Sequence, residues 1–529
     1  MKWMQIILSL IVILLFINGV LLLRQTFKTP ANIRHFLFAE GDKILEGMQT
    51  GPEEITVDFD KQIATGSPLV FGGVHSPDSN QQDVWNKITD AGVTAIRRGF
   101  FMENLLPKNI TYEDYKNNIN DIQNPANWNR KEINELSKIF QNAKSRNMKV
   151  MGILIYPPAW LTYSNTQYGV PKDWEVYEDI VKKIYLLLRN NLDYIEIWNE
   201  PNNSSFLDTV DSGLTNEAAY QQIYYHSAKA IRDTDLGIND GKITRIGGPA
   251  LSNTKAINYI NNLFTSNDTK NLVDFISIHY YGDQDYSLGL IKETLAQYKK
   301  DTLPIFLTEW NYQLGEIYDQ NFRSGTKAIT FTGSKLLAYL NDGLTGANYY
   351  VLLPIDRQKE EKDDPYMGFY NTNNRQVVEL LPQVKTWRLL SKSMKLGKGE
   401  SKIFETKSSI TNNQFSISDL FSDSINGLGF ENVDGEKGMA IVNDSDSEKY
   451  FKVTLKNIDK KELKFGKFPI DIYIASAEYD GGKAVDRNYL QPDKNGNIIF
   501  TLLLPAKSVD GVIEVKENNL KEIIRSYIP

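Results

Sequence analysis

The sequence contains no cysteine, and only four of its 529 residues are histidines. This composition excludes disulfide bonds, thiolate metal sites and cysteine nucleophiles, and it leaves few imidazole groups for a metal cluster. The chain has no excess of positive charge either. It contains 59 lysines and arginines and 66 aspartates and glutamates, which gives a formal net charge of −7. Since no basic field would concentrate a polyanion, we expect no nucleic acid partner.

Low-complexity tracts and long internal repeats are also lacking. Hydrophobic residues make up 41% and charged residues 24% of the chain, values close to those of globular domains. At about 100 to 200 residues per domain, 529 residues are too many for one compact unit. We therefore expect two folded domains with shorter appendages.

Charged residues are absent from residues 4–23, a stretch long enough to cross a hydrocarbon layer of about 30 Å as one helix. We expect a transmembrane anchor over residues 1–24 and a juxtamembrane stalk over 25–52. The alternative is a cleaved secretory signal, but the apolar stretch exceeds the usual 7 to 15 residues and no small-residue cleavage site follows promptly. Either way, the main body is expected outside the membrane, as a single-pass cell-membrane protein or as a secreted one.

Short apolar runs alternate with helical patterns from residue 69 onward, and there are eight such runs. They are LVFGGV (69–74), VTAIRR (93–98), KVMGILIY (149–156), YIEIWN (194–199), ITRIGGP (243–249), FISIHYY (275–281), PIFLTEW (304–310) and ANYYVLL (347–353). Helical patterns cover 81–91, 130–146, 174–189, 218–233, 321–341 and 376–394. Such alternation is typical of parallel strands joined by helical crossovers.

Eight β/α units predict an α/β fold of the TIM type, a (β/α)₈ barrel over residues 65–394. A doubly wound open sheet is the runner-up. That fold normally has fewer units and a glycine-rich phosphate turn after its first strand, and FGGVHSP is not such a turn.

The pattern changes again beyond residue 395, where strand-like runs are separated by turn residues. We expect an accessory antiparallel β-sandwich here, completed by the alternating strand EITVDFD (54–60), so that the second domain comprises residues 53–64 and 395–529. The turn DKNGN (493–497) lacks the distal glutamate of a calcium loop and is interpreted as a hairpin turn.

Two of the predicted barrel strands end in glutamate. Glu200 follows the fourth strand in YIEIWNEPN, and Glu309 follows the seventh strand in FLTEWN. Because the carboxyl ends of barrel strands meet at one mouth, we expect the two side chains to face each other. Two carboxyl groups about 5 to 5.5 Å apart suit glycoside hydrolysis with retention. Taken singly, Glu200 could be an acidic N-cap and Glu309 a solvated strand end.

The strings around these glutamates, with ISIHYYG on the sixth strand, resemble clan A glycoside hydrolases, and WNEPN with a flanking β-sandwich is most similar to family 39. That group contains β-xylosidases, iduronidases and exopolysaccharide endoglycosidases. The resemblance implies that Glu200 is the general acid/base, Glu309 the nucleophile, and Asn199 a hydrogen-bond partner of the sugar 2-hydroxyl. It also places His279 and Tyr281 near the nucleophile.

Arg97 lies on the second strand, where period-two alternation gives Val93, Ala95 and Arg97 a common face. We expect Arg97 to point into the mouth and to keep Glu309 ionised, unless a bulge exchanges it with Arg98. Glu196 is interpreted as a buried partner of Arg97.

Aromatic residues supply candidates for stacking on sugar rings. Trp198 and Trp310 lie within two residues of the two glutamates, and the loop after the third strand carries Tyr156 and Trp160. We expect them to line the cleft. For the loop, an aromatic mini-core is an equal alternative.

The sequence thus predicts a retaining glycoside hydrolase that needs no metal or organic cofactor and acts on an extracellular or cell-envelope polysaccharide. An exo-acting β-xylosidase-like enzyme is the nearest rival. A transglycosylase would share the mechanism, and a non-catalytic carbohydrate-binding or assembly protein is the alternative outside enzymology. The β configuration of the bond rests on the resemblance alone, and the oligomeric state is left open.

Overall fold

The computed structural model describes most of the chain downstream of residue 52. The described residues are 37–39, 53–253, 256–281, 288–312, 325–353, 368–373, 376–408, 427–464 and 466–516. Within these ranges, no helix combines the length and the apolar character needed to cross a membrane. The predicted anchor, residues 4–23, lies outside them and stays a prediction.

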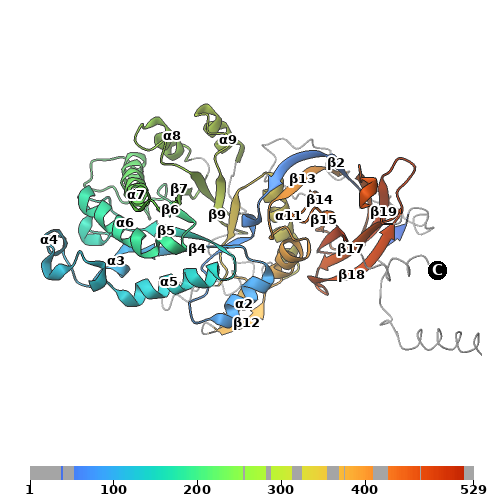
Figure 1. Cartoon of the computed structure of the whole chain (residues 1–529), viewed down its shortest axis with the longest axis horizontal. Helices are drawn as coiled ribbons and strands as arrows, with labels where there is room; N and C mark the ends of the chain where they lie inside the picture. The colour runs from blue at the N-terminus through green and yellow to red at the C-terminus, as the bar shows by residue number, and fades with distance from the viewer. Residues whose placement is uncertain are drawn as a thin grey trace, which may run out of the picture.

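Eight parallel strands close into a barrel (Figure 1). In order around the ring they are β3 (Gly72–Val74), β4 (Ala95–Phe101), β5 (Lys149–Ile155), β6 (Tyr194–Ile197), β7 (Arg245–Leu251), β8 (Phe275–Tyr281), β9 (Ile305–Asn311) and β10 (Gly346–Tyr349). Each strand falls within, or overlaps, one of the eight predicted apolar runs. The predicted barrel is therefore confirmed.

Helices pack around the strands. They include α2 (Gln82–Ala91), α5 (Arg130–Lys144), α6 (Trp174–Leu188), α7 (Asn216–Ile238), α8 (Asn258–Thr265), α9 (Leu288–Gln297) and α11 (Lys327–Asn341), with the short α3 (Met102–Leu105) and α4 (Tyr112–Lys116) after β4. In α5, Ile133, Leu136, Phe140 and other apolar residues at spacings of three and four form the buried face. The Asn129 side chain accepts a hydrogen bond from the amide of Glu132 and so caps the first turn of this helix.

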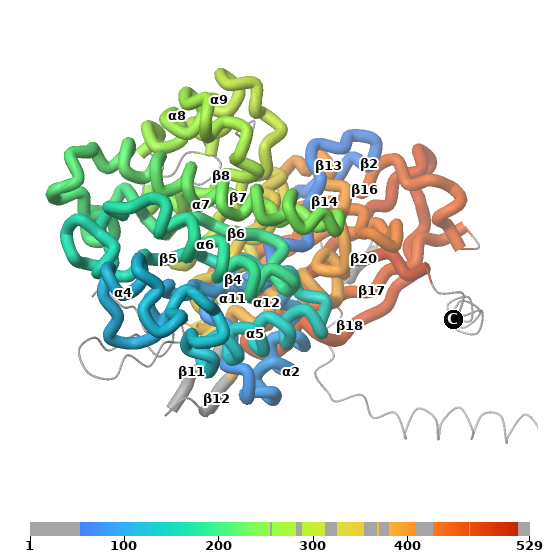
Figure 2. Tube along the Cα trace, turned by 60° about the vertical axis from the view of Figure 1, so that its left-hand side comes forward, coloured from blue at the N-terminus to red at the C-terminus, as the bar shows by residue number. Residues whose placement is uncertain are grey.

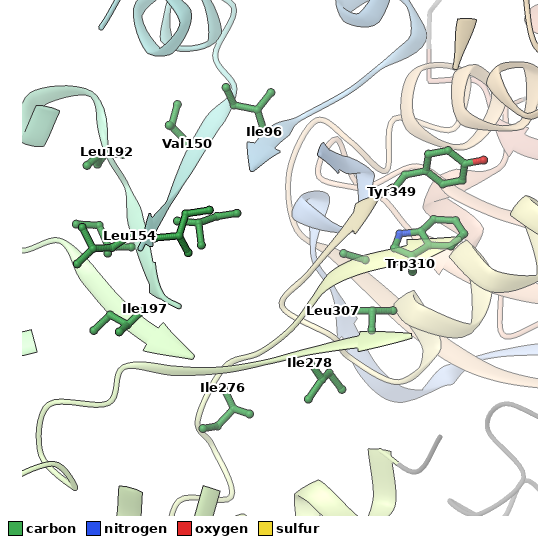
Figure 3. Packing of buried hydrophobic residues seen from close by; sticks show 14 of the residues in the cluster. Ile96, Val150, Leu154, Leu192, Ile197, Ile276, Ile278, Leu307, Trp310 and Tyr349 are labelled. Atoms are coloured by element: carbon green, nitrogen blue, oxygen red, sulfur yellow. The ribbon is translucent and has the colours of Figure 1, made fainter. Parts of the chain in front are cut away.

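The strands are buried on both faces, and alternation divides their side chains into two sets. On β8, Ile276 and Ile278 pack into the apolar layer between barrel and helices, where Figure 3 shows them near Leu307. Ser277, His279 and Tyr281 occupy the opposite face of the same strand. Period two therefore decides which side chains reach the barrel interior.

One helix prediction was wrong in part. Residues 376–394 do not form a single helix, because Gln376–Leu380 is strand β12, which pairs with β11 (Tyr370–Asn373). The helix α12 begins only at Gln383 and ends at Trp387, and a π-helical segment, η7 (Arg388–Ser393), follows it. The reason lies in the sequence: two valines favour the strand, and Pro382 suits a helix start but not a helix interior.

The second domain is one continuous ten-stranded sheet, where an antiparallel two-sheet sandwich was expected. Its order is β1 (Leu37–Ala39), β19 (Ile498–Leu504), β16 (Lys449–Lys456), β2 (Glu53–Gly66), β13 (Ser401–Ser408), β14 (Gly427–Glu431), β15 (Lys437–Asn443), β20 (Ser508–Glu514), β17 (Phe468–Ala475) and β18 (Asp480–Leu490). The early strand β2 makes the difference. It runs parallel to β16 and antiparallel to β13, so it joins what would otherwise be two separate sheets.

The sheet has an apolar core of its own, to which Val57, Val453, Ile472 and Phe500 belong. Helix α11 lies on the side of the barrel next to this sheet and contacts β2, β15 and β20 (Figures 1 and 2). The approach is close at Gly333, because a Cβ placed there would lie 2.5 Å from Cγ2 of Val509. Gly333 is thus a contact point between the two domains.

We predict that Gly333→Ala destabilises the protein by about 1 to 3 kcal/mol, because the stiff, buried Val509 must move to admit the methyl group. Gly237→Ala in α7 is the matched control, since no atom lies within 4 Å of the corresponding Cβ position. That variant should gain up to about 1 kcal/mol from its higher helix propensity. Unfolding followed by calorimetry or urea titration measures both, and equal stabilities for the two variants would contradict the close contact.

Candidate active site

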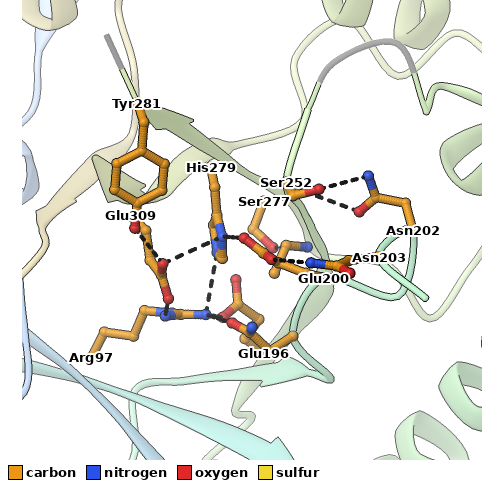
Figure 4. Close-up of polar contacts among 12 residues, drawn as sticks. Arg97, Glu196, Glu200, Asn202, Asn203, Ser252, Ser277, His279, Tyr281 and Glu309 are labelled. Carbon is orange, nitrogen blue, oxygen red and sulfur yellow. Dashed lines mark hydrogen bonds and ion pairs between the residues drawn. The ribbon is translucent and has the colours of Figure 1, made fainter. Parts of the chain in front are cut away.

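The candidate site is formed by residues that lie on, or shortly after, four of the barrel strands. Arg97 comes from β4, Glu200 follows β6, His279 and Tyr281 come from β8, and Glu309 comes from β9. Figure 4 shows their side chains turned toward one another. The closed ring brings together residues that are up to 212 positions apart in sequence.

Arg97 is the centre of this cluster and is almost fully buried. Its Nε lies 2.7 Å from Oε2 of Glu196, and its Nη1 lies 2.6 Å from Oε1 of Glu309. Nη2 donates to Oδ1 of Asn199 over 3.0 Å. Since a guanidinium can only donate, it fixes the oxygen of the Asn199 amide on its own side and turns the NH₂ group away. Arg97 therefore orients three neighbouring side chains.

Glu309 is held through both of its carboxylate oxygens. Besides the ion pair with Arg97, the Tyr281 hydroxyl donates to Oε2 over 2.7 Å. Burial alone would raise the pKa of Glu309, but the electrostatic effects of the neighbouring His279 and Arg97 and the hydrogen bonds from Tyr281 and Arg97 outweigh it and lower the pKa. The pKa of the Tyr281 phenol is raised well above its usual value, mainly by burial. At neutral pH, Glu309 is therefore a carboxylate and Tyr281 a donor.

Glu200 approaches Glu309 across His279. Nδ1 of His279 lies 2.7 Å from Oε1 of Glu200 and 3.5 Å from Oε2 of Glu309. One oxygen of each glutamate and a ring nitrogen of His279 all lie within 4.8 Å of one another. Two carboxyl groups thus share one small volume, and only one of them is held by a guanidinium.

A model of the cellulase family, described as glycosyl hydrolase family 5, matches residues 60–341, more than half of the chain. The chain belongs to glycosyl hydrolase family 5. It is therefore a glycoside hydrolase of clan A, which confirms the predicted enzyme class and clan. Among curated proteins, none matches the chain.

Solved structures share the fold of this family 5 member. A glucosidase from Croceicoccus marinus has a TM-score of 0.60 at 14% identity, covering 88% of this chain and 99% of that one. The family 30 xylanase Xyn30A from Clostridium acetobutylicum has a TM-score of 0.58 at 15% identity, covering 87% and 99%. A family 39 enzyme from Xanthomonas axonopodis pv. citri has a TM-score of 0.56 at 13% identity, covering 89% and 98%. The last is consistent with the predicted family 39 similarity.

The two tryptophans next to the glutamates do not line a cleft in this family 5 member. Trp198 and Trp310 are both fully buried. The Trp198 indole donates to the carbonyl of Phe206 over 2.8 Å, and Trp310 stacks on Trp387, with ring centroids 6.0 Å apart. Figure 3 shows Trp310 beside Tyr349. The prediction of cleft contacts was wrong for both. Trp310 directly follows the inward-facing Glu309 on β9 and therefore faces outward. Trp198 lies beyond the end of β6 and has a φ of +71°, so strand alternation does not decide its direction.

The loop after β5 forms an aromatic mini-core, the alternative left open by the sequence. Tyr156 is 4% exposed and packs edge-on against Trp198 and Tyr168. Trp160 is half-buried and stacks on Tyr115, with ring centroids 5.7 Å apart. The expected open stacking surface is therefore not formed by Tyr156, and one face of Trp160 is already covered.

Sequence reasoning missed Tyr350, which follows β10 and borders the site. Its ring centroid lies 6.1 Å from that of Tyr281 and 5.4 Å from that of His75. The signal was available, since Tyr350 belongs to the eighth apolar run and so follows the rule that strand ends carry the site.

The described part of this family 5 member brings together one set of possible metal ligands, Glu200, His279 and Glu309. A divalent cation there would share Glu309 with the Arg97 guanidinium, 2.6 Å from Oε1. Like charges at such distances repel strongly in a buried site. The donor set therefore fits acid–base and nucleophilic chemistry better than metal binding.

Proposed function

We propose that this glycoside hydrolase retains the anomeric configuration of its substrate, with Glu309 as nucleophile and Glu200 as general acid/base. The short separation of the two glutamates supports the proposal above all. One carboxyl oxygen of Glu200 lies within 4.8 Å of one carboxyl oxygen of Glu309. Retaining enzymes hold their carboxyl groups about 5 to 5.5 Å apart, whereas inverting enzymes leave about 6.5 to 9.5 Å for a water molecule.

The electrostatics favour this assignment of roles. Glu309 has a lowered pKa and is held ionised by Arg97, as a nucleophile must be. Its attack on the anomeric carbon forms a glycosyl-enzyme bond while Glu200 gives a proton to the departing oxygen. Glu200, now a base, then takes a proton from the water that breaks this bond.

Asn199 and His279 are proposed to serve the same steps. The Asn199 NH₂ group, turned away from Arg97, is available for a sugar hydroxyl at the nucleophile's side of the site. His279 lies between both carboxyl groups and fixes Glu200 relative to Glu309.

We propose a β-linked polysaccharide with a glucan or xylan backbone as the substrate. The matching family is described as cellulase, and the solved structures that share the fold include xylanases and a bifunctional glucanase-xylanase. The alternative is an exo-acting β-xylosidase-like enzyme, which would remove terminal sugars from short substrates instead of cleaving within a polysaccharide.

A polysaccharide screen with matched variants tests the function. Wild-type protein should release oligosaccharides from xylan, carboxymethylcellulose or mixed-linkage glucan, whereas aryl β-xyloside as the sole substrate would identify the exo-acting rival. Glu309→Ala should lower kcat by at least about 10⁴-fold, since the nucleophile is lost, and Glu200→Gln by about 10² to 10⁴-fold. Binding of these glycans without turnover by the wild type would contradict the proposal and favour a non-catalytic carbohydrate-binding protein.

The acid limb of the pH profile of kcat/KM should depend on the hydrogen bond from Tyr281 to Glu309, because this bond helps to lower the pKa of Glu309. Activity is present above the pKa of Glu309 and is lost as the pH falls through it, so the lowered pKa extends activity below the usual carboxyl range. Tyr281→Phe removes a donor to the carboxylate, so the acid limb should move up by about one pH unit.

Tyr280→Phe is the matched control, because the Tyr280 hydroxyl lies on the other face of β8, 3.3 Å from Nζ of Lys335 in α11. Its acid limb should match that of the wild type. Coinciding profiles for Tyr281→Phe and Tyr280→Phe would show that Tyr281 does not set the ionisation of Glu309.

A further inference from the structure

The backbone that carries Glu200 adopts an unusual conformation. Trp198 and Glu200 have φ angles of +71° and +48°, and Ala250, at the end of the neighbouring strand β7, has a φ of +54°. Residues with a Cβ rarely occupy this left-handed region, and they stay there only when surrounding contacts hold them. The direction of the Glu200 side chain therefore depends on what fixes residues 198–202.

Backbone contacts fix part of this segment against β7 and α8. The Glu200 amide donates to the carbonyl of Ala250 over 3.1 Å, and the Tyr259 hydroxyl donates to the carbonyl of Pro201 over 3.0 Å. The amide of Ala250 in turn donates to Oγ of Ser277 on β8, over 2.9 Å. The loop after β6 is thus hydrogen-bonded to the end of β7, which is itself hydrogen-bonded to a side chain of β8.

One pair of side chains completes this support. The amide of Ser252 donates to Oδ1 of Asn202 over 3.0 Å, and Nδ2 of Asn202 donates to Oγ of Ser252 over 2.9 Å (Figure 4). Both ends of one carboxamide are therefore used to join the loop after β6 to the loop after β7. We refer to Asn202 and Ser252 as the loop clamp.

We propose that the loop clamp is a positioning device for the general acid/base, acting through the backbone of Glu200; this rests on the proposed function. Its effect should be confined to one of the two carboxyl groups. Glu309 is held by Arg97 of β4 and Tyr281 of β8, neither of which the clamp contacts. Within the described ranges, the Glu200 carboxylate is contacted by His279, whose Nδ1 lies 2.7 Å from Oε1, and more distantly by Asn203, whose Nδ2 donates to Oε2 over 3.5 Å. Loosening the clamp should therefore disturb proton transfer and spare nucleophilic attack.

Leaving-group dependence separates these two effects. An aryl glycoside of 2,4-dinitrophenol needs no protonation when its bond breaks, whereas one of 4-methylphenol does. Asn202→Ala should lower kcat/KM for the 4-methylphenyl β-xylobioside or β-cellobioside by about tenfold or more, part of the 10² to 10⁴-fold that a general acid contributes. The value for the dinitrophenyl substrate should change by less than about threefold on the same grounds.

Ser252→Ala removes one of the two hydrogen bonds and should give a smaller effect of the same kind, which keeps the test open if Asn202→Ala folds poorly. Thr209→Val is the matched control. It removes a 3.0 Å hydrogen bond to Asn216 further along the same loop, away from residues 198–202. Its ratio of the two kcat/KM values should equal that of the wild type.

The proposed role of the loop clamp would be overturned if the Asn202 and Ser252 variants lost kcat/KM equally on both substrates, or lost none. Glu200→Ala distinguishes this outcome from failure of the proposed function. If Glu200→Ala shows the leaving-group dependence and the clamp variants do not, only the clamp is refuted. If Glu200→Ala affects both substrates alike, the acid/base role of Glu200 itself is refuted.

Discussion

The ion pairs of Arg97 are the interaction on which the site depends. The guanidinium is 1% exposed and lies between Glu196, which is fully buried, and Glu309. A buried charge is costly unless it is paired, and removing one partner of such a pair typically costs about 3 to 5 kcal/mol. Each of the three groups therefore needs the others, and the closed barrel keeps β4, β6 and β9 in the register that lets them meet.

This network makes two similar carboxyl groups unequal. Glu309 is tied to Arg97, and its pKa is lowered, while Glu200 follows a different strand and approaches through His279. A reaction that needs one ionised and one protonated carboxyl group requires such a difference in surroundings. The positive φ angle of Glu200 and the loop clamp add to this difference between the two glutamates. Both act on the position of the Glu200 carboxyl group, and neither involves a contact with Glu309.

Much of this could be predicted from the sequence, because barrel strands and their ends follow simple periodicity. The eight apolar runs gave the barrel, and alternation placed Arg97 on the face that contains Glu309. The same rule, applied to Trp310, would have turned its indole outward into the helix layer, where it stacks on Trp387. Other features depend on long-range pairing. The position of β2 between β16 and β13 and the joining of Asn202 to Ser252 arise only when distant segments meet.

Covalent trapping tests the central claim, that Glu309 is the nucleophile of a retaining enzyme, most directly. A 2-deoxy-2-fluoro-β-glycoside with a dinitrophenolate leaving group, built on the sugar that the enzyme cleaves, should inactivate it and leave one fluorosugar per molecule. Mass spectrometry of the peptides should locate this label on Glu309, within FLTEWN. A label on another carboxylate, or unlabelled enzyme whose products appear with inverted anomeric configuration, would contradict the account.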